Sequence, residues 1–450
     1  MSPEGKDLVE MTAAAAAAAI REGRISSEEL VRACLERIDE VEPIVQAWTF
    51  LDPEHALAQA RAADEMRKVG RPLGPLHGVP VGIKDIFDTH DMPTEDGTVL
   101  HAGRQPHFDS HVVARLREAG AIIMGKTVTT ELAVYTPGKT RNPHNPEHTP
   151  GGSSSGSAAA VAAHMVPLAI GSQTNGSVIR PAAYCGVWGY KPTHGLISRT
   201  GVLHQSYLLD HVGVFARTAE DTALVATCIM GFDANDRDMR PRAAPPLVNA
   251  VASGPPLPPN FAFVRTPVWD KIEPDAEAAF AELIELLGPQ AREMALPSEF
   301  DAALDLHRTI HEADLAVSFA PEYERGRDKL SPRLVEMIER GQRIPASAYI
   351  RAVERIPLLN AALGSIFEWA DVILTPATAG EAPRGLESTG SPAFCTIWTL
   401  LGMPAVTVPI LEGSRGLPMG VQLVAPRHDD ARLLAVAKWL ENRVRDAGNR

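Results

Sequence analysis

The seven residues Gly171-Ser172-Gln173-Thr174-Asn175-Gly176-Ser177 decide how this chain is interpreted, because they place a serine at the end of a glycine-containing turn. Glycine lets the backbone approach a substrate closely. Backbone N–H groups in such a turn can point at the oxyanion of a tetrahedral intermediate, where each donor contributes roughly 3 to 4 kcal/mol. The N–H groups of Thr174, Asn175, Gly176 and Ser177 are therefore candidates for an oxyanion hole.

Two further stretches contain groups that can activate a serine. A lone lysine lies near the end of the apolar stretch Gly78-Val79-Pro80-Val81-Gly82-Ile83-Lys84-Asp85, and a Gly/Ser run covers Gly151-Gly152-Ser153-Ser154-Ser155-Gly156-Ser157. A serine hydroxyl is a poor nucleophile until a base takes its proton, and lysine is such a base only when burial lowers its pKa. The apolar residues before Lys84 predict that burial. Each stretch alone is more typical of an exposed lysine or a flexible loop, so the argument depends on their combination.

Taken together, these stretches resemble the amidase signature family. That family combines a Gly/Ser-rich block, a second glycine–serine turn and a run of the type Arg180-Pro181-Ala182-Ala183-Tyr184-Cys185-Gly186, ending near Lys191-Pro192-Thr193. The resemblance also covers the segments 78–89, 125–127, 375–377 and 402–405, and it is weaker between about 235 and 370. It therefore spans most of the chain.

The resemblance implies a role for three residues. Lys84 matches the family's lysine base, Ser153 matches a bridging serine held by a cis peptide bond, and Ser177 matches the nucleophile. Neutral Lys84 would take a proton from Ser153, which takes one from Ser177 as it attacks the carbonyl carbon of an amide. The resemblance thus implies an amidase that cleaves a carboxamide C–N bond through an acyl-enzyme, with no cofactor and no metal.

Two departures from the family pattern lie beside Ser177. Gln173 stands where the family often has an acidic residue, and Arg180 lies one place later than the family's arginine. The acidic partner of a salt bridge expected near the nucleophile is therefore missing. We expect these differences to tune the site without abolishing it.

Strand-like and helical segments alternate along the chain, which predicts an α/β fold. With the resemblance, this alternation predicts one large domain over 1–450, an amidase signature fold with a mixed, mostly parallel twisted β-sheet covered by helices on both faces. Within it we expect a catalytic core at about 70–220, a variable helical part at about 235–370, and C-terminal strands and a helix at about 371–445. The expected segments are strands at 79–87, 121–124, 261–264, 372–375, 405–408 and 420–424, and helices within 8–70 and at 112–119, 273–287, 299–319 and 346–368.

Local signals refine this fold. Ser26 and Glu29 have capping-box spacing ahead of an apolar helix face. The alanines Ala13–Ala19 have acidic flanks, so we interpret them as a packed helix and not as a signal peptide. Residues 137–157 are rich in Pro, Gly and Ser, which predicts a long functional loop, and residues 235–259 are expected to form a surface excursion or a hinge.

Composition and charge disfavour several classes of protein. The chain has 43 basic and 56 acidic residues, a net charge of −13, and no dense basic cluster, which argues against nucleic-acid binding. No apolar run approaches the roughly 20 residues that cross a bilayer, so we expect no membrane association. Four widely spaced cysteines favour a reducing, cytoplasmic location. The expected partner is a small-molecule amide substrate, and a homodimer is left open.

Two alternatives keep the same motifs but change the role of the chain. The A subunit of a tRNA-dependent amidotransferase shares these motifs, has a glutaminase role and needs partner subunits. A catalytically silent scaffold on the same fold would not need Lys84, Ser153 and Ser177 together. Co-purification with another chain would identify the first of these alternatives.

Two more alternatives change the chemistry. A metal-dependent amidohydrolase is suggested by two histidine pairs, His307 with His311 and His144 with His148, but neither pair has a convincing third ligand. The Gly-x-Ser-x-Gly elbow of α/β hydrolases would make Ser154 the nucleophile. An elbow needs a strand directly before it, and the proline-broken loop before Gly152 does not provide one.

Substrate identity is the least determined property. Four residues near the presumed active-site loops are candidates for substrate binding, and core packing explains them about as well: Tyr135, Phe394, Ile397 and Trp398. The expected substrate is a small aryl or alkyl amide.

Overall fold

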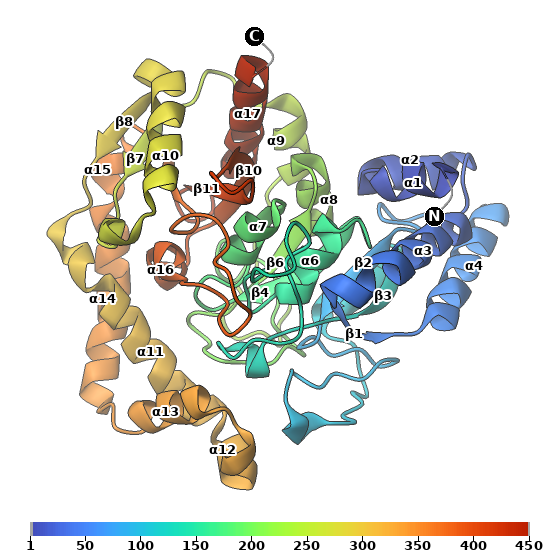
Figure 1. Ribbon diagram of the computed structural model, residues 1–450, viewed down its shortest axis with the longest axis horizontal. Helices are drawn as coiled ribbons and strands as arrows, with labels where there is room; N and C mark the ends of the chain where they lie inside the picture. Colours follow the sequence, from blue (N-terminus) through green and yellow to red (C-terminus); the bar gives the residue numbers. More distant parts are fainter. Residues whose placement is uncertain (1–2, 449–450) are drawn as a thin grey trace.

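One β-sheet runs through residues 3–448, the part of the chain that the computed structural model describes (Figure 1). Its eleven strands, in the order in which they lie side by side, are β1 (Trp48–Leu51), β3 (Ile122–Thr127), β2 (Pro80–Lys84), β4 (Leu168–Gln173), β6 (His211–Ala216), β5 (Trp188–Lys191), β10 (Ala405–Glu412), β11 (Pro418–Val424), β9 (Val372–Pro376), β7 (Phe261–Val264) and β8 (Ala291–Met294).

The helices of the described chain cover this sheet and extend beyond one end of it. They are α1 (Pro3–Glu10), α2 (Ala13–Glu22), α3 (Ser27–Val45), α4 (Pro53–Lys68), α5 (His111–Glu118), α6 (Ser155–Ala162), α7 (Ile179–Cys185), α8 (Ala219–Ile229), α9 (Leu247–Ser253), α10 (Pro274–Leu287), α11 (Ala303–Ser318), α12 (Ala320–Gly326), α13 (Pro332–Gly341), α14 (Ala346–Ala362), α15 (Gly364–Phe367), α16 (Ala393–Leu400) and α17 (Asp430–Gly448). In Figure 1, α11 to α14 form an arm on the left and α1 to α4 lie on the right, with the sheet between them.

The connections between strands explain how they pair. The chain passes from β2 through α5 to β3, and then through α6 to β4 on the other side of β2. Both are parallel to β2, and parallel strands need such crossover connections. β10 and β11 are joined by a short turn and pair antiparallel. Within residues 3–448, four of the ten pairings are parallel, in the groups β3-β2-β4 and β9-β7-β8, and the others are antiparallel. The expected single α/β domain, with a large mixed sheet and helices on both faces, is confirmed, but antiparallel pairings outnumber the parallel ones that were expected to prevail.

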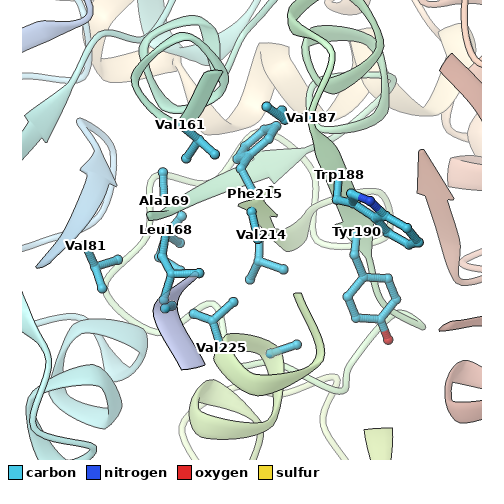
Figure 2. Close-up of a cluster of buried hydrophobic side chains, with 14 of the residues drawn as sticks. Val81, Val161, Leu168, Ala169, Val187, Trp188, Tyr190, Val214, Phe215 and Val225 are labelled. Atoms are coloured by element: carbon cyan, nitrogen blue, oxygen red, sulfur yellow. The ribbon is translucent and has the colours of Figure 1, made fainter. Parts of the chain in front are cut away.

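The central strands are buried on both faces. Successive residues of a strand point to opposite faces of its sheet. Figure 2 shows Val214 and Phe215 of β6 on opposite sides, with Val161 of α6 above the sheet and Val225 of α8 below it, and all four are fully buried. This two-sided packing holds the ends of β2 and β4 in fixed positions, and the candidate catalytic groups lie at these ends.

The structure differs from the expected segments in places. Residues 8–70 are mainly helical, as expected, but they also contain strand β1, which pairs with β3 at the edge of the sheet. Ser26 and Glu29 form the expected capping box at the start of α3, and the alanine run lies in α2. The expected excursion at 235–259 contains helix α9. The loop at 137–157 is irregular as far as Ser154, the residue before α6.

Two further observations concern location. No helix within residues 3–448 combines the length and the apolar character that a membrane-spanning helix needs. All four cysteines are buried, free thiols. The cytoplasmic location and the homodimer stay predictions.

Candidate active site

Lys84 ends strand β2, which lies between β3 and β4 and is buried along its whole length. The residue itself is 0% exposed. Loss of hydration disfavours the charged ammonium, so burial lowers the pKa of Lys84 well below its ordinary value. Lys84 Nζ lies 2.6 Å from Ser153 Oγ and 2.8 Å from Ser172 Oγ. The predicted burial of Lys84 is confirmed. Because burial favours its neutral form, the residue can act as a base toward the two hydroxyl groups beside it.

Ser153 lies in the loop before α6, where the Gly152–Ser153 peptide bond is cis, as the resemblance implied. Gly151 has a φ of +83°, and a Cβ at this position would lie 2.8 Å from Cα of Pro181, so the loop passes very close to α7. Arg180 Nη2 donates to the Gly152 carbonyl (2.6 Å), and Arg180 Nη1 donates to the Gly390 carbonyl (2.7 Å). Arg180 therefore joins the loop of Ser153 to the loop before α16.

The two departures from the family pattern are accommodated by neutral groups. Gln173 Oε1 accepts hydrogen bonds from the N–H groups of Val178 (2.8 Å) and Ile179 (3.0 Å), and Gln173 Nε2 donates to Thr399 Oγ1 (2.9 Å). Arg180 is fully buried and, within residues 3–448, binds carbonyl groups and no carboxylate. Hydrogen bonds to an amide and to carbonyls thus replace the missing salt bridge at the start of α7.

The turn from Thr174 to Ser177 is held by its carbonyl oxygens. His307 Nε2 donates to the Thr174 carbonyl (2.9 Å), and Thr399 Oγ1 donates to the Asn175 carbonyl (2.5 Å). The Gly176 carbonyl accepts from the N–H of Arg180 in α7 (3.0 Å).

These anchors leave the N–H side of the turn open. The C=O and N–H of a trans peptide point in opposite directions. Each anchored carbonyl therefore turns the following N–H group away from its anchor. Within residues 3–448 the N–H groups of Asn175, Gly176 and Ser177 have no hydrogen-bond acceptor. Consecutive free donors next to a serine can bind a developing oxyanion.

Ser177 follows this turn and remains slightly accessible, with 7% of its surface exposed. Glycine at position 176 allows the turn to pass close to α16, because a Cβ on residue 176 would lie only 2.9 Å from Cβ of Pro392 in the loop before that helix. Within residues 3–448, no hydrogen bond joins Ser177 Oγ to Ser153 Oγ. Catalytic hydrogen bonds are often long without substrate and tighten in the complex, so this gap does not exclude proton transfer.

The structure separates the four candidate pocket residues. Tyr135 is half-buried and lines a cavity of about 440 Å³ together with Asn175, whose Nδ2 donates to Tyr135 Oη (3.0 Å). Phe394, Ile397 and Trp398 of α16 are buried in hydrophobic clusters and do not line this cavity. Core packing, the alternative considered for these three residues, accounts for their positions.

The histidines considered as metal ligands have protein hydrogen bonds instead. His144 Nε2 contacts the Cys185 carbonyl and His148 Nδ1 contacts the Ala382 carbonyl, at 2.9 and 2.7 Å. His307 binds the turn, as described, and His311 Nε2 contacts Gln205 Oε1 at 2.9 Å. Burial lowers the pKa of His307 to about 4 and that of His311 to about 3. His307 and His311 are therefore buried rings held by hydrogen bonds, whereas His144 is exposed, His148 is buried, and each of these two contacts a backbone carbonyl.

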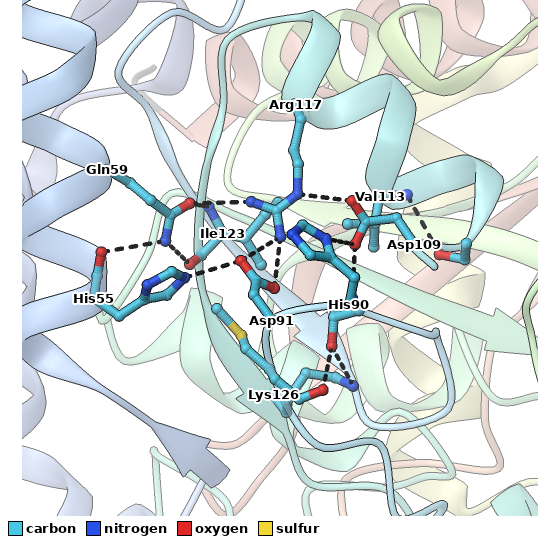
Figure 3. Close-up of polar contacts among 12 residues, drawn as sticks. His55, Gln59, His90, Asp91, Asp109, Val113, Arg117, Ile123 and Lys126 are labelled. Carbon is cyan, nitrogen blue, oxygen red and sulfur yellow. Dashed lines mark hydrogen bonds and ion pairs between the residues drawn. The ribbon is translucent and has the colours of Figure 1, made fainter. Parts of the chain in front are cut away.

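His90, Asp91 and Asp109 offer possible ligand atoms within 4.8 Å of one another, but an arginine binds the two carboxylates (Figure 3). Arg117 Nη2 lies 2.7 Å from both carboxylate oxygens of Asp91, and Arg117 Nε lies 3.0 Å from Asp109 Oδ2. His55 of α4 contacts Asp91 as well, at 2.9 Å. The network therefore ties α4 and α5 to the segment after β2.

Ser154, the serine of the elbow-like pattern, has a structural role. Its hydroxyl is fully buried, accepts from the N–H of Ser172 and donates to the carbonyl of Ser172, both at 3.2 Å. Residues 137–154, which precede α6, are irregular, so the strand that an elbow needs is missing from this part of the described chain. These contacts fasten the loop of Ser153 to the end of β4.

Sequence reasoning missed three groups that contact Lys84 or the turn at 174–177. Ser172 was part of the quoted stretch, and its position five residues before Ser177 was the only available signal. Thr399 and His307 lie on α16 and α11, which are remote in the sequence, and no motif marked either one.

A family model and several known proteins are similar to this chain. The model described as Amidase matches residues 29–434. The A subunit of glutamyl-tRNA(Gln) amidotransferase from Chloroflexus aggregans is 34% identical, over 95% of this chain and 95% of its own. The structure of 6-aminohexanoate cyclic dimer hydrolase with substrate has a TM-score of 0.87 at 27% identity, covering 97% of this chain and 98% of its own. Peptide amidase from Stenotrophomonas maltophilia has a TM-score of 0.84 at 29% identity, covering 97% of each chain.

Proposed function

This chain belongs to the amidase family, and we propose that it hydrolyses a carboxamide through an acyl-enzyme on Ser177, with Ser153 and Lys84 as its proton carriers. One observation carries the proposal. Burial lowers the pKa of Lys84, and its amine lies 2.6 Å from Ser153 Oγ, beside the turn at 174–177 that ends in Ser177 and is called the nucleophile turn below. A neutral amine in this position can accept a proton through Ser153, which a protonated lysine cannot do.

In the proposed first half-reaction, Ser177 Oγ attacks the carbonyl carbon of the amide. Its proton passes to Ser153 Oγ, and the proton of Ser153 passes to Lys84 Nζ, which becomes an ammonium. The free N–H groups of the turn at 174–177 bind the oxyanion that forms. The C–N bond then breaks, and the leaving nitrogen receives a proton from Ser153, which regains one from Lys84.

In the second half-reaction, water attacks the acyl-enzyme ester. The proton of that water follows the same path to Lys84 and returns to Ser177 Oγ as the ester C–O bond breaks. The products are a carboxylic acid and ammonia or an amine. Both half-reactions balance without a cofactor.

A panel of aliphatic, aromatic and amino-acid amides, assayed for ammonia release, tests this proposal. We expect release by the wild type and a loss of at least about a thousandfold in Ser177→Ala and Lys84→Ala. Ser154→Ala is the matched control, because its hydroxyl binds the backbone of Ser172 and not Lys84. Intact-mass measurement after rapid quenching should detect an acyl adduct in the wild type and in Ser154→Ala. Undiminished activity of Ser177→Ala would refute the assignment of the nucleophile.

A second candidate function is supported by the amidotransferase relative, which is 34% identical over 95% of both chains. In that case the chain would be an A subunit with a glutaminase role, and the same groups would release ammonia from glutamine. The test is glutaminase activity of the chain alone and after mixing with candidate partner subunits. Activity that appears only in a stable complex would favour the subunit role over the free amidase.

A further inference from the structure

The cavity beside the nucleophile turn is large enough for a small molecule. It has a volume of about 440 Å³, and pockets of about 300 to 1,000 Å³ are typical of small ligands. Asn175, two residues before Ser177, forms part of its wall. The remaining wall comes from Tyr135 and Lys271, from α11 and α13, and from the start of α16 with the two residues before it.

The charges of the side chains around this cavity do not sum to zero. Two of its four basic residues have acidic partners inside the cavity: Arg308 Nη2 lies 2.8 Å from Asp305, and Arg340 Nη2 lies 2.6 Å from Glu312. The other two, Lys271 and Arg333, have no carboxylate within 4.0 Å among residues 3–448. An excess of positive charge therefore surrounds this cavity, although the whole chain carries a net charge of −13.

Arg333 is an exposed residue whose guanidinium lies against an aromatic ring, and its hydrogen-bond donors have no partner within residues 3–448. Its guanidinium lies over the ring of Tyr135, with Cζ 4.3 Å from the ring centroid. Tyr135 Oη in turn accepts the hydrogen bond from Asn175 Nδ2. One aromatic ring thus separates the guanidinium from the nucleophile turn. Stacking occupies the face of a guanidinium and leaves its N–H edge free, and that edge matches the two oxygens of a carboxylate.

We propose that the substrate is an amide that also carries a carboxylate, and that Arg333, with Lys271 nearby, binds this carboxylate while the carboxamide reaches Ser177. The proposal rests on the proposed function and narrows its substrate class to small amide acids. The substrate expected from the sequence was a small aryl or alkyl amide, and the proposal replaces it with an amide that also has an anionic end. Phe394, Ile397 and Trp398 have no part in this binding site.

Matched pairs of substrates test the proposal. Glutaramate and adipamate each carry one carboxamide and one carboxylate, and glutaramide and adipamide are their uncharged counterparts. The measured quantity is the ratio of kcat/KM for the acid to kcat/KM for the diamide. We expect the wild type to prefer the acids. Arg333→Gln should lower the ratio by about tenfold or more, the loss typical of one charge-assisted hydrogen bond, and Arg333→Lys should restore part of it.

Arg355→Gln is the control, because it removes an exposed positive charge from the neighbouring helix α14 without lining the cavity. Its ratio should equal that of the wild type. If the wild type prefers the diamides, or if Arg333→Gln leaves the ratio unchanged, the carboxylate site is refuted while amide hydrolysis stands.

Failure of the proposed function gives a different result, because no substrate is then hydrolysed by any form. In that case glutaramate binding to Ser177→Ala, measured by calorimetry, decides the question. Binding that weakens about tenfold or more when Arg333→Gln is added supports the carboxylate site. If glutaramate does not bind, or if Arg333→Gln leaves its affinity unchanged, the carboxylate site is refuted.

Discussion

Replacing Ser172 by alanine should move the acid limb of the pH–activity profile to lower pH. Lys84 Nζ donates to two hydroxyl oxygens, Ser153 at 2.6 Å and Ser172 at 2.8 Å, and both stabilise its ammonium form. Ser172→Ala removes one of them, so the ammonium becomes less stable and the pKa of Lys84 falls further. Under the proposed function activity requires the neutral amine, so activity should persist to lower pH in the variant.

The size of this effect follows from the contact that is lost. A hydrogen bond to a charged group contributes about 1.5 to 3 kcal/mol, and about 1.4 kcal/mol corresponds to one pH unit. The acid limb of kcat/KM should therefore move by roughly one pH unit or more. The assay is ammonia release from a neutral amide across pH, with each profile scaled to its own plateau. Ser154→Ala is the control, because its hydroxyl has no contact with Lys84. An acid limb of Ser172→Ala that stays in place, or moves to higher pH, would contradict this account of Lys84.

Two further predictions concern the same site. Lys84→Met should raise the free energy of unfolding by about 1 to 3 kcal/mol at low and neutral pH, because burying an amine is costly. Burial lowers the pKa of folded Lys84 below its value in the unfolded chain, so wild-type stability rises with pH between those two pKa values. The stability advantage of Lys84→Met should therefore shrink as the pH rises. Urea unfolding at several pH values measures this, and a difference in unfolding free energy that stayed constant or widened would exclude the account. His307→Phe leaves the Thr174 carbonyl without its donor and should lower kcat about tenfold with a smaller effect on KM, whereas His307→Gln keeps a donor and should retain most of kcat. Steady-state kinetics of both His307 variants check this, and equal losses in the two would argue against an anchoring role.

The contiguous motifs were the most predictable part of the site. An apolar strand before Lys84 predicts burial, and the strand lies between two parallel neighbours in the structure. The Gly/Ser run and the glycine–serine turn predicted two loops at the ends of buried segments. In the structure the Lys84 amine contacts Ser153 in the first loop and Ser172 just before the second. Local sequence carries such information because backbone geometry depends on neighbouring residues.

Contacts between remote segments were not predictable. Thr399 and His307 anchor the nucleophile turn from α16 and α11, and no local pattern marks a residue whose role depends on a distant partner. Apolar spacing on α16 also cannot distinguish a pocket from a core, so Phe394 and Trp398 were candidates for binding although both are packed inside. Strand β1 was missed because four residues between two helices give too short a pattern.

Ribosomes make this chain from its N-terminus, so Lys84, Ser153 and Ser177 are synthesised long before Thr399 leaves the exit tunnel. Until then the Asn175 carbonyl lacks the hydroxyl that holds it, and Gln173 lacks one of its partners. A nascent chain can therefore contain all three proposed catalytic residues while the proposed oxyanion donors remain unaligned. Under the proposed function, hydrolysis would have to wait until α16 has been synthesised and has packed against the turn.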